Sequence, residues 1–249
     1  MRVAAIQLRS GVDIDANLRA AEALIRAAAG EGASFIATPE MTHILQRSPK
    51  RLFAALRPEA EDKGAAFFAA LADELGVHLL IGSLAVLKSE GRAANRSLLF
   101  GTDGQILARY DKIHLFTATV NDSTGNYDEG RTFEAGNELI VADTEFGQVG
   151  MMVCFDIRFP TLAVKLRELG ADILTAPSAF TYQTGKAHWH ALLTARALDS
   201  QCMVIGAGQT GDHVVNPSAP GNVRSTWGHS EFITSHGESV LTQKIDAAN

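Results

Sequence analysis

A cysteine at the end of an apolar run is the residue in this sequence best suited to nucleophilic chemistry. Cys154 lies near the end of segment 149–155 (Val-Gly-Met-Met-Val-Cys-Phe), which is apolar on both faces and predicts a buried central strand. A helix is expected from Pro160, because proline is favoured in the first helical turn. Cys154 would then lie at the sheet edge where ligands bind in open α/β sheets. The alternative is a buried structural thiol, since free cysteine packs as a small hydrophobic residue.

Two charged residues also follow predicted strands. Glu40 comes shortly after segment 35–38 (Phe-Ile-Ala-Thr), and Lys112 shortly after segment 105–110. At such an edge a carboxylate can transfer protons and a compact cation can stabilise negative charge on oxygen. Each residue also has an ordinary alternative. Glu40 could be an acid at a helix N-terminus, and Lys112 a surface lysine whose stem packs on apolar groups.

Three other motifs match a known chemistry only in part. Segment 206–211 (Gly-Ala-Gly-Gln-Thr-Gly) fits the dinucleotide fingerprint, but the residues after it predict no helix to hold a pyrophosphate. His188 and His190 are two apart on a predicted helix and so point to different faces, and no Cys/His cluster is present. Asn95-Arg-Ser97 is a glycosylation triplet, which matters only in a secreted protein. We therefore expect no metal and no organic cofactor.

Alternating strands and helices must position these residues. In the first part of the chain we predict strands at 3–8, 35–38 and 77–81 and helices at 15–29 and 64–75. Two successive strand–helix–strand units favour an α/β layer structure.

The second part of the chain repeats this pattern. Hairpins are predicted for 97–110 and 138–155, followed by a helix at 160–169, a strand at 171–176, a helix at 186–200, a strand at 203–207, a polar loop at 209–224 and a hairpin around 235–237. The last hairpin is similar to the first, which suggests two similar halves forming a sandwich. The sequence contains no linker rich in Pro, Gly or Ser, so we expect a single domain over 1–249.

The composition of the 249 residues is that of an ordinary globular protein, with 46% hydrophobic and 20% charged residues. The 22 basic and 28 acidic residues give a net charge of −6, which does not favour a nucleic-acid or anionic membrane surface. No apolar run approaches the ~18 residues of a membrane span. The two cysteines form no disulfide framework, so we expect a cytoplasmic protein.

The order Glu, Lys, Cys, each after a strand, resembles the nitrilase (carbon–nitrogen hydrolase) superfamily. The local motifs are 38–40 (Thr-Pro-Glu), 110–116 (Tyr-Asp-Lys-Ile-His-Leu-Phe) and 153–160 (Val-Cys-Phe-Asp-Ile-Arg-Phe-Pro). Further motifs resemble its Nit-type amidase branch, which holds ω-amidase-like and deaminated-glutathione-amidase-like enzymes. They are 177–180 (Pro-Ser-Ala-Phe), 184–189 (Thr-Gly-Lys-Ala-His-Trp), 193–197 (Leu-Thr-Ala-Arg-Ala) and 227–230 (Trp-Gly-His-Ser).

This resemblance implies a fold and a set of roles. The fold is a four-layer α-β-β-α sandwich, which often assembles into a homodimer or a higher homo-oligomer. Glu40 matches the general base, Lys112 the lysine of the oxyanion site, and Cys154 the nucleophile. Many members use a second glutamate between the lysine and the cysteine. That role falls best on Glu129, with Asp128 and Glu134 as neighbours that could be confused with it.

These roles suit the hydrolysis of a small-molecule amide. Cys154 would attack the carbonyl, Lys112 and the Phe155 backbone N–H would stabilise the oxyanion, and a thioester would form as ammonia leaves. Arg158 could pair with a substrate carboxylate or equally with a protein carboxylate. Phe180 and Thr181 are also assigned to substrate binding.

The substrate is expected to be a small ω-amide of a carboxylic acid. Segment 155–159 resembles the Nit branch rather than the Trp-Glu pattern of true nitrilases. The alternatives are an N-carbamoyl or nitrile hydrolase of the same superfamily, a non-catalytic binding member, or a thiol redox protein, although no CxxC motif is present. The chain departs from the family pattern at Thr161 and His190, where relatives usually carry glutamate, and loop 117–127 matches nothing in the family.

Overall fold

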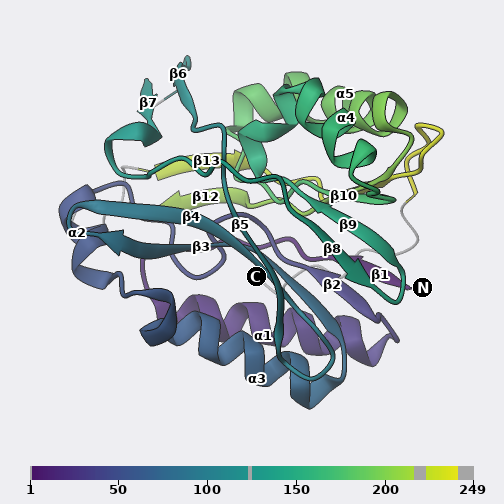
Figure 1. Ribbon diagram of the computed structural model, residues 1–249. Coiled ribbons are helices and arrows are strands. Elements are labelled where there is room, and N and C mark those ends of the chain that lie inside the picture. Colours follow the sequence, from purple (N-terminus) through teal and green to yellow (C-terminus); the bar gives the residue numbers. More distant parts are fainter. Residues whose placement is uncertain (1, 123–124, 216–222, 241–249) are drawn as a thin grey trace.

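Two five-stranded sheets lie between two layers of helices (Figure 1). The computed structural model describes residues 2–122, 125–215 and 223–240. The first sheet has the order β1-β2-β3-β4-β5, with bounds Val3–Ala5, Phe35–Ala37, His78–Ser89, Arg92–Phe100 and Ile106–Asp111. The second has the order β14-β11-β10-β9-β8, with bounds Glu231–Ile233, Met203–Gly206, Ile173–Thr175, Gly147–Met151 and Val141–Thr144.

Helices cover the outer faces of these sheets (Figure 1). Helices α1 (Ile14–Gly30) and α3 (Lys63–Leu75) pack on the first sheet, and α4 (Pro160–Glu168) and α5 (Tyr182–Ser200) on the second. The prediction of a four-layer α-β-β-α sandwich is confirmed. As far as the described residues go, none of the helices is long and apolar enough to cross a membrane.

Local sequence explains where these helices begin and end. The Asp62 side chain caps α3 by accepting the backbone N–H of Ala65 at 2.9 Å, and Gly76 ends it in the left-handed conformation at φ 61°. Asp13 caps α1 in the same way through the N–H of Ala16. Helix α5 begins at Tyr182, four residues earlier than predicted, because the Thr181 side chain accepts the N–H of Thr184.

The strands alternate between two apolar cores. In β2, Phe35 and Ala37 belong to the core between the sheets, whereas Ile36 belongs to the core beneath α1 and α3. Strands β1, β2 and β3 are parallel, and so are β9, β10 and β11. Each half therefore presents the carboxyl ends of several strands at one edge.

The remaining elements are short and include two additional ribbons. Helix α2 is Pro49–Ala55; β6 (Thr117–Thr119) pairs with β7 (Asn126–Asp128), and β12 (Thr210–Val214) with β13 (Val223–Trp227). The prediction of a loop over 209–224 is wrong for β12, and residues 216–222 of that loop lie outside the described residues. The prediction of a strand over 148–155 is also wrong at its end, because β9 stops at Met151.

Gly82 allows the two halves to approach closely. It lies where the pairing of β3 with β4 is irregular, and a Cβ there would be 2.1 Å from the Thr38 carbonyl oxygen and 2.4 Å from the Pro177 Cβ. We expect Gly82→Ala to lower the free energy of unfolding by about 1–3 kcal/mol through this overlap. Urea unfolding measures it. Gly30→Ala is the control, since no atom lies within 4 Å of a Cβ there. Equal stabilities of the two variants would contradict the prediction.

Candidate active site

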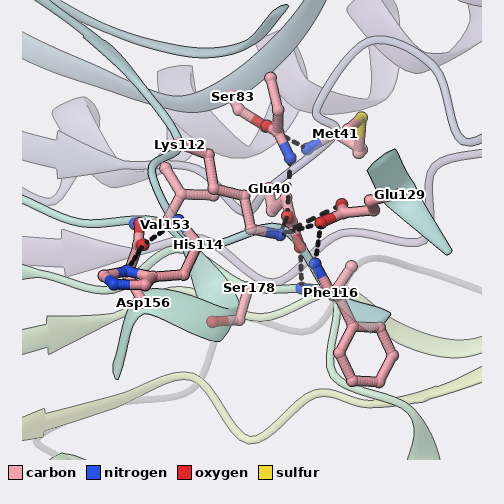
Figure 2. Close-up of polar contacts among 12 residues, drawn as sticks. Glu40, Met41, Ser83, Lys112, His114, Phe116, Glu129, Val153, Asp156 and Ser178 are labelled. Atoms are coloured by element: carbon pink, nitrogen blue, oxygen red, sulfur yellow. Dashed lines mark hydrogen bonds and ion pairs between the residues drawn. The ribbon is translucent and has the colours of Figure 1, made fainter. Parts of the chain in front are cut away.

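Lys112 lies between two glutamates at the centre of the site (Figure 2). Its Nζ is 2.8 Å from Glu40 Oε1 and 2.8 Å from Glu129 Oε2. Cys154 lines the same pocket as Glu40, Lys112 and Glu129. Lys112 and Glu40 are 1% and 3% exposed, so this is a buried charged cluster rather than a surface ion pair. The structure thus brings together all four residues that the sequence singled out as catalytic.

Both carboxylate oxygens of Glu40 are held by other parts of the chain. Oε1 accepts Asn95 Nδ2 at 2.9 Å in addition to Lys112, and Oε2 accepts the backbone N–H of Ala179 at 2.9 Å. The Glu40 carbonyl accepts Gln209 Nε2 at 3.0 Å. Burial acts to raise the pKa of Glu40, but the charge of Lys112 and these hydrogen bonds outweigh it and leave the pKa below its ordinary value.

Cys154 lies in a tight turn after β9 rather than in the strand itself. It begins a 3₁₀ helix (Cys154–Arg158), and its φ of 52° is in the left-handed region that non-glycine residues seldom adopt. Its backbone N–H donates to the Pro177 carbonyl at 2.9 Å, which fixes the turn to the end of β10. As predicted, Cys154 lies at the edge of the sheet. Its backbone, however, forms a sharp turn after β9 and is not part of the strand.

The surroundings of Cys154 favour the neutral thiol over the thiolate. Burial raises the pKa of Cys154, and the nearby negative charge of Glu40 raises it further, while Lys112 acts in the opposite direction. Burial acts to raise the pKa of Glu40 as well, but the charge of Lys112 keeps that pKa below its ordinary value. The arrangement therefore places a proton acceptor beside the group that must lose a proton.

Asp156 joins the cysteine turn to the end of β5. Its carboxylate is fully buried and accepts the Tyr110 hydroxyl at 2.7 Å. It also accepts the backbone N–H groups of Val153 and His114, both at 2.9 Å (Figure 2). Burial, followed by the charge of Asp156, raises the pKa of Tyr110 well above its ordinary value. This network holds the strand end carrying Lys112 in register with Cys154.

The structure places Glu129, and neither of its acidic neighbours, against Lys112. Glu129 begins a 3₁₀ helix (Glu129–Arg131), and its Oε2 also accepts the backbone N–H of Phe116 at 2.6 Å. Glu134 instead pairs with Lys88 at 2.7 Å, and Asp128 pairs with Arg131.

A small pocket of about 20 Å³ opens beside these groups. The four residues expected to bind substrate all line it: Phe155, Arg158, Phe180 and Thr181. Phe116, Thr184 and Arg224 line it as well, although their sequence context did not mark them as substrate-binding residues. Aromatic rings make up part of its wall, with the rings of Phe116 and Phe155 5.1 Å apart.

Arg158 carries a charge that no carboxylate among the described residues neutralises. Its guanidinium lies 5.8 Å from the Phe155 ring centre and 5.3 Å from that of Phe180, and Nη2 is 3.1 Å from His188 Nδ1. Within the described part of the chain it forms no salt bridge with an aspartate or glutamate. The alternative of a structural ion pair is therefore not observed. Burial lowers the pKa of Arg158 from its ordinary value.

The partly matching motifs have structural surroundings of their own. Segment 206–211 leads from β11 into β12, so a strand rather than a helix comes directly after it. His188 contacts Arg158, whereas His190 pairs with Glu231, so the two histidines serve different contacts. Over residues 2–122, 125–215 and 223–240, no group of three or more His, Cys, Asp or Glu side chains is placed to hold a metal ion.

Comparisons with known proteins agree on one family. The carbon–nitrogen hydrolase family model matches residues 2–244. The deaminated glutathione amidase of Yersinia enterocolitica is 37% identical over 99% of this chain and 84% of its own length. The deaminated glutathione amidase of Mus musculus is 32% identical over 98% of this chain and 77% of its own length.

Solved structures lead to the same family. Nit3 of Saccharomyces cerevisiae, a member of branch 10 of the nitrilase superfamily, matches with a TM-score of 0.81 and 28% identity over 96% of this chain and 83% of its own. The Caenorhabditis elegans NitFhit protein matches with a TM-score of 0.82 and 30% identity. That match covers 96% of this chain but 56% of the NitFhit chain.

The fold and the family match together define a hydrolase of the nitrilase superfamily. The chain belongs to the carbon–nitrogen hydrolase family and is an enzyme that hydrolyses carbon–nitrogen bonds.

Proposed function

We propose that this enzyme hydrolyses a small ω-amide of a carboxylic acid through a thioester on Cys154. The observation that carries the proposal is the buried contact of Lys112 with both Glu40 and Glu129, in the pocket that Cys154 also lines. The relatives named deaminated glutathione amidase support an amide as the substrate.

In the first half of the reaction Glu40 takes the thiol proton as the Cys154 sulfur attacks the amide carbonyl. Lys112 and the Phe155 backbone N–H stabilise the negative charge that develops on the carbonyl oxygen. Glu40 then returns the proton to the nitrogen, the C–N bond breaks, and ammonia leaves behind an acyl thioester. Glu129 holds the Lys112 ammonium at the position where the oxyanion forms.

In the second half a water molecule takes the place of ammonia. Glu40 accepts a proton from this water as its oxygen attacks the thioester carbonyl, with Lys112 again beside the oxyanion. The C–S bond breaks, the thiol regains its proton, and the carboxylic acid is released. Phe155, Phe180 and Thr181 would line the acyl group, and Arg158 would bind its carboxylate.

A panel of compounds tests the reaction class. Ammonia release is measured from ω-amides such as succinamate, from N-carbamoyl amino acids and from aliphatic nitriles. We expect kcat/KM to be highest for the ω-amides and lower for the neutral amide butyramide, which lacks a group for Arg158. Highest turnover of an N-carbamoyl compound or a nitrile would favour the alternative within the superfamily, and no turnover of any of them would favour a binding member.

The pH dependence should show a broad plateau. Glu40 must be ionised, and its pKa lies below the ordinary 4.5, so activity is lost only when the pH falls below that value. Lys112 must be protonated, and its pKa is raised well above the ordinary 10.5; burial acts to lower it, but the charges of Glu129 and Glu40 prevail. We expect kcat/KM to be flat from roughly pH 5 to pH 9. An acid limb centred near neutrality would instead indicate a histidine base.

We propose a homodimer or a higher homo-oligomer as the working assembly. Large apolar side chains are exposed in α4 and α5 or directly after α4, including Val164, Leu169 and Leu198. We take this helix layer as the candidate contact surface between copies of the chain, since exposed apolar surface is favourable to bury in protein–protein contacts. Light scattering measures the assembly, and Leu198→Glu, which adds a charge to this face, should shift it towards the monomer.

We propose a single catalytic domain in the cytoplasm, with no cofactor, nucleic acid or membrane as partner. The core between the sheets takes residues from both halves, which supports one domain. Both cysteines are free, and a nucleophilic thiol needs a reducing compartment to remain active. Imaging of the tagged full chain in its own cells tests the location.

A further inference from the structure

Arg224 is a second guanidinium at the pocket, and it comes from a different part of the chain than Arg158. It lies in β13, and its Nη2 donates to the Ala179 carbonyl at 2.7 Å. Its guanidinium carbon is 5.6 Å from the centre of the Tyr127 ring. Arg224 is therefore fixed against the pocket wall on two sides, by a peptide carbonyl and by an aromatic face.

Among the described residues, the charge of Arg224 has no carboxylate partner, because it forms no salt bridge with an aspartate or glutamate there. Arg96, which is also partly buried, has two carboxylate partners, Asp111 and Glu59. Arg224 lines the pocket, and an anionic oxygen is the acceptor that a guanidinium prefers. A negatively charged group of a ligand in the pocket would therefore suit this guanidinium best.

Arg224 lies on the side of the pocket where Glu40 is held. The Ala179 peptide accepts Arg224 through its carbonyl and donates its N–H to Glu40 Oε2. In the proposed reaction Glu40 protonates the departing nitrogen, so a group attached to that nitrogen would lie towards Arg224. Arg158 is in the turn that carries Cys154 and contacts Phe155 and Phe180. The two arginines therefore suit two different ends of a substrate.

We propose that Arg224 is a specificity-determining residue that binds a carboxylate on the amine portion of the substrate, while Arg158 binds a carboxylate on the acyl portion. This inference rests on the proposed amidase function and extends it from ammonia release to amides of amino acids. The bond changes are the same, except that Glu40 transfers the proton to an amino-acid nitrogen, so that the products are the acid and a free amino acid.

Two substrates with one acyl group test the proposal. Succinamate and N-succinylglycine form the same succinyl thioester on Cys154, so hydrolysis of the thioester is common to both. They differ in the second carboxylate, which N-succinylglycine carries on its leaving amine. Release of succinate is measured for the wild type, Arg224→Gln and Arg224→Lys. Arg131→Gln is the surface control, since Arg131 is 82% exposed and pairs only with Asp128 among the described acids.

We expect Arg224→Gln to lower kcat/KM for N-succinylglycine on the order of 10²-fold more than for succinamate, the scale of losing a charged hydrogen-bond partner. Arg224→Lys should recover part of that loss. Arg158→Gln should lower both rates by similar factors, and Arg131→Gln should change neither. Equal losses for both substrates in Arg224→Gln would overturn the proposal, because Arg224 would then act only through the Ala179 peptide on Glu40.

A binding measurement separates this proposal from the proposed function. N-Succinylglycine should protect Cys154 from alkylation by iodoacetamide in the wild type, and Arg224→Gln should weaken this protection more than the protection by succinamate. Equal protection in the two proteins would overturn the role of Arg224 even if succinamate is hydrolysed. Protection that depends on Arg224, without turnover of either compound, would instead contradict the amidase proposal and support the anion site.

Discussion

Cys154→Ala should abolish turnover of an amide substrate, with a loss on the order of 10³-fold or more, the scale of removing a covalent nucleophile. The alanine variant keeps Glu40 and Lys112 but has no atom to form the thioester. Cys154→Ser should be almost as inactive, because the hydroxyl is a weaker nucleophile and Glu40 is a weak base for it. Because only the sulfur is removed, the unfolding midpoint should change little.

Cys202→Ala is the matched control for this experiment. Cys202 is fully buried, and its Sγ contacts the Ala171 carbonyl at 3.1 Å, away from the pocket. Its replacement should leave turnover within a few-fold of the wild type, and iodoacetamide should still alkylate one cysteine, Cys154. Retention of more than a few per cent of activity by Cys154→Ala, measured on the folded protein, would disprove the assignment of the nucleophile.

Glu129→Gln should lower turnover on the order of 10²-fold, the scale of losing one positioned electrostatic group. The two oxygens of Glu129 accept Lys112 Nζ, and Oε2 also accepts the Phe116 N–H. A glutamine presents an NH₂ group in place of one oxygen, so one of these donors must face another donor. The variant also loses a negative charge that raises the pKa of Lys112, and the alkaline limb of the pH profile should move to lower pH.

Glu134→Gln serves as the comparison, because it makes the same chemical change five residues away. The side chain of Glu134 is 43% exposed and pairs with Lys88, so its replacement should leave turnover unchanged. If Glu134→Gln loses turnover while Glu129→Gln keeps it, the functional contact to Lys112 has been misassigned. If both variants are as active as the wild type, a second glutamate plays no part in this enzyme.

Elements with a clear local pattern could be predicted from the residues themselves. Helices α1 and α3 have a capping aspartate, an apolar face and a glycine at or near the end, and the predicted bounds differ from the observed ones by one residue. Strand β12 was missed because Thr210–Val214 is polar and contains a glycine, which is typical of a loop. Its strand conformation depends on pairing with β13, a partner that no local pattern reveals.

The catalytic candidates could be named from sequence because each lies in a motif with its own local signal. Cys154 follows a strand apolar on both faces, and Glu40 and Lys112 also come just after strands. The choice of Glu129 over Glu134 rested on resemblance, and the contact with Lys112 now supports it. By contrast, Asn95, Asp156 and Arg224 gave no such signal, because a polar residue in a strand or turn is usually a solvated one.

The sequence by itself determined the layer architecture, the order of the elements and the residue types able to attack, shuttle a proton and stabilise an oxyanion. Local periodicity and turn chemistry are sufficient for the order of strands and helices, whereas the four-layer architecture and the roles of the residues were implied by the resemblance to the nitrilase superfamily. Only the tertiary structure decided which groups hold Glu40 and which cations face the pocket. Ala179 is 139 residues from Glu40 in the chain, and it binds that carboxylate because the two sheets pack together. Packing between the sheets brings side chains that are far apart in the chain into contact. Such contacts cannot be inferred from the local pattern of a single sequence.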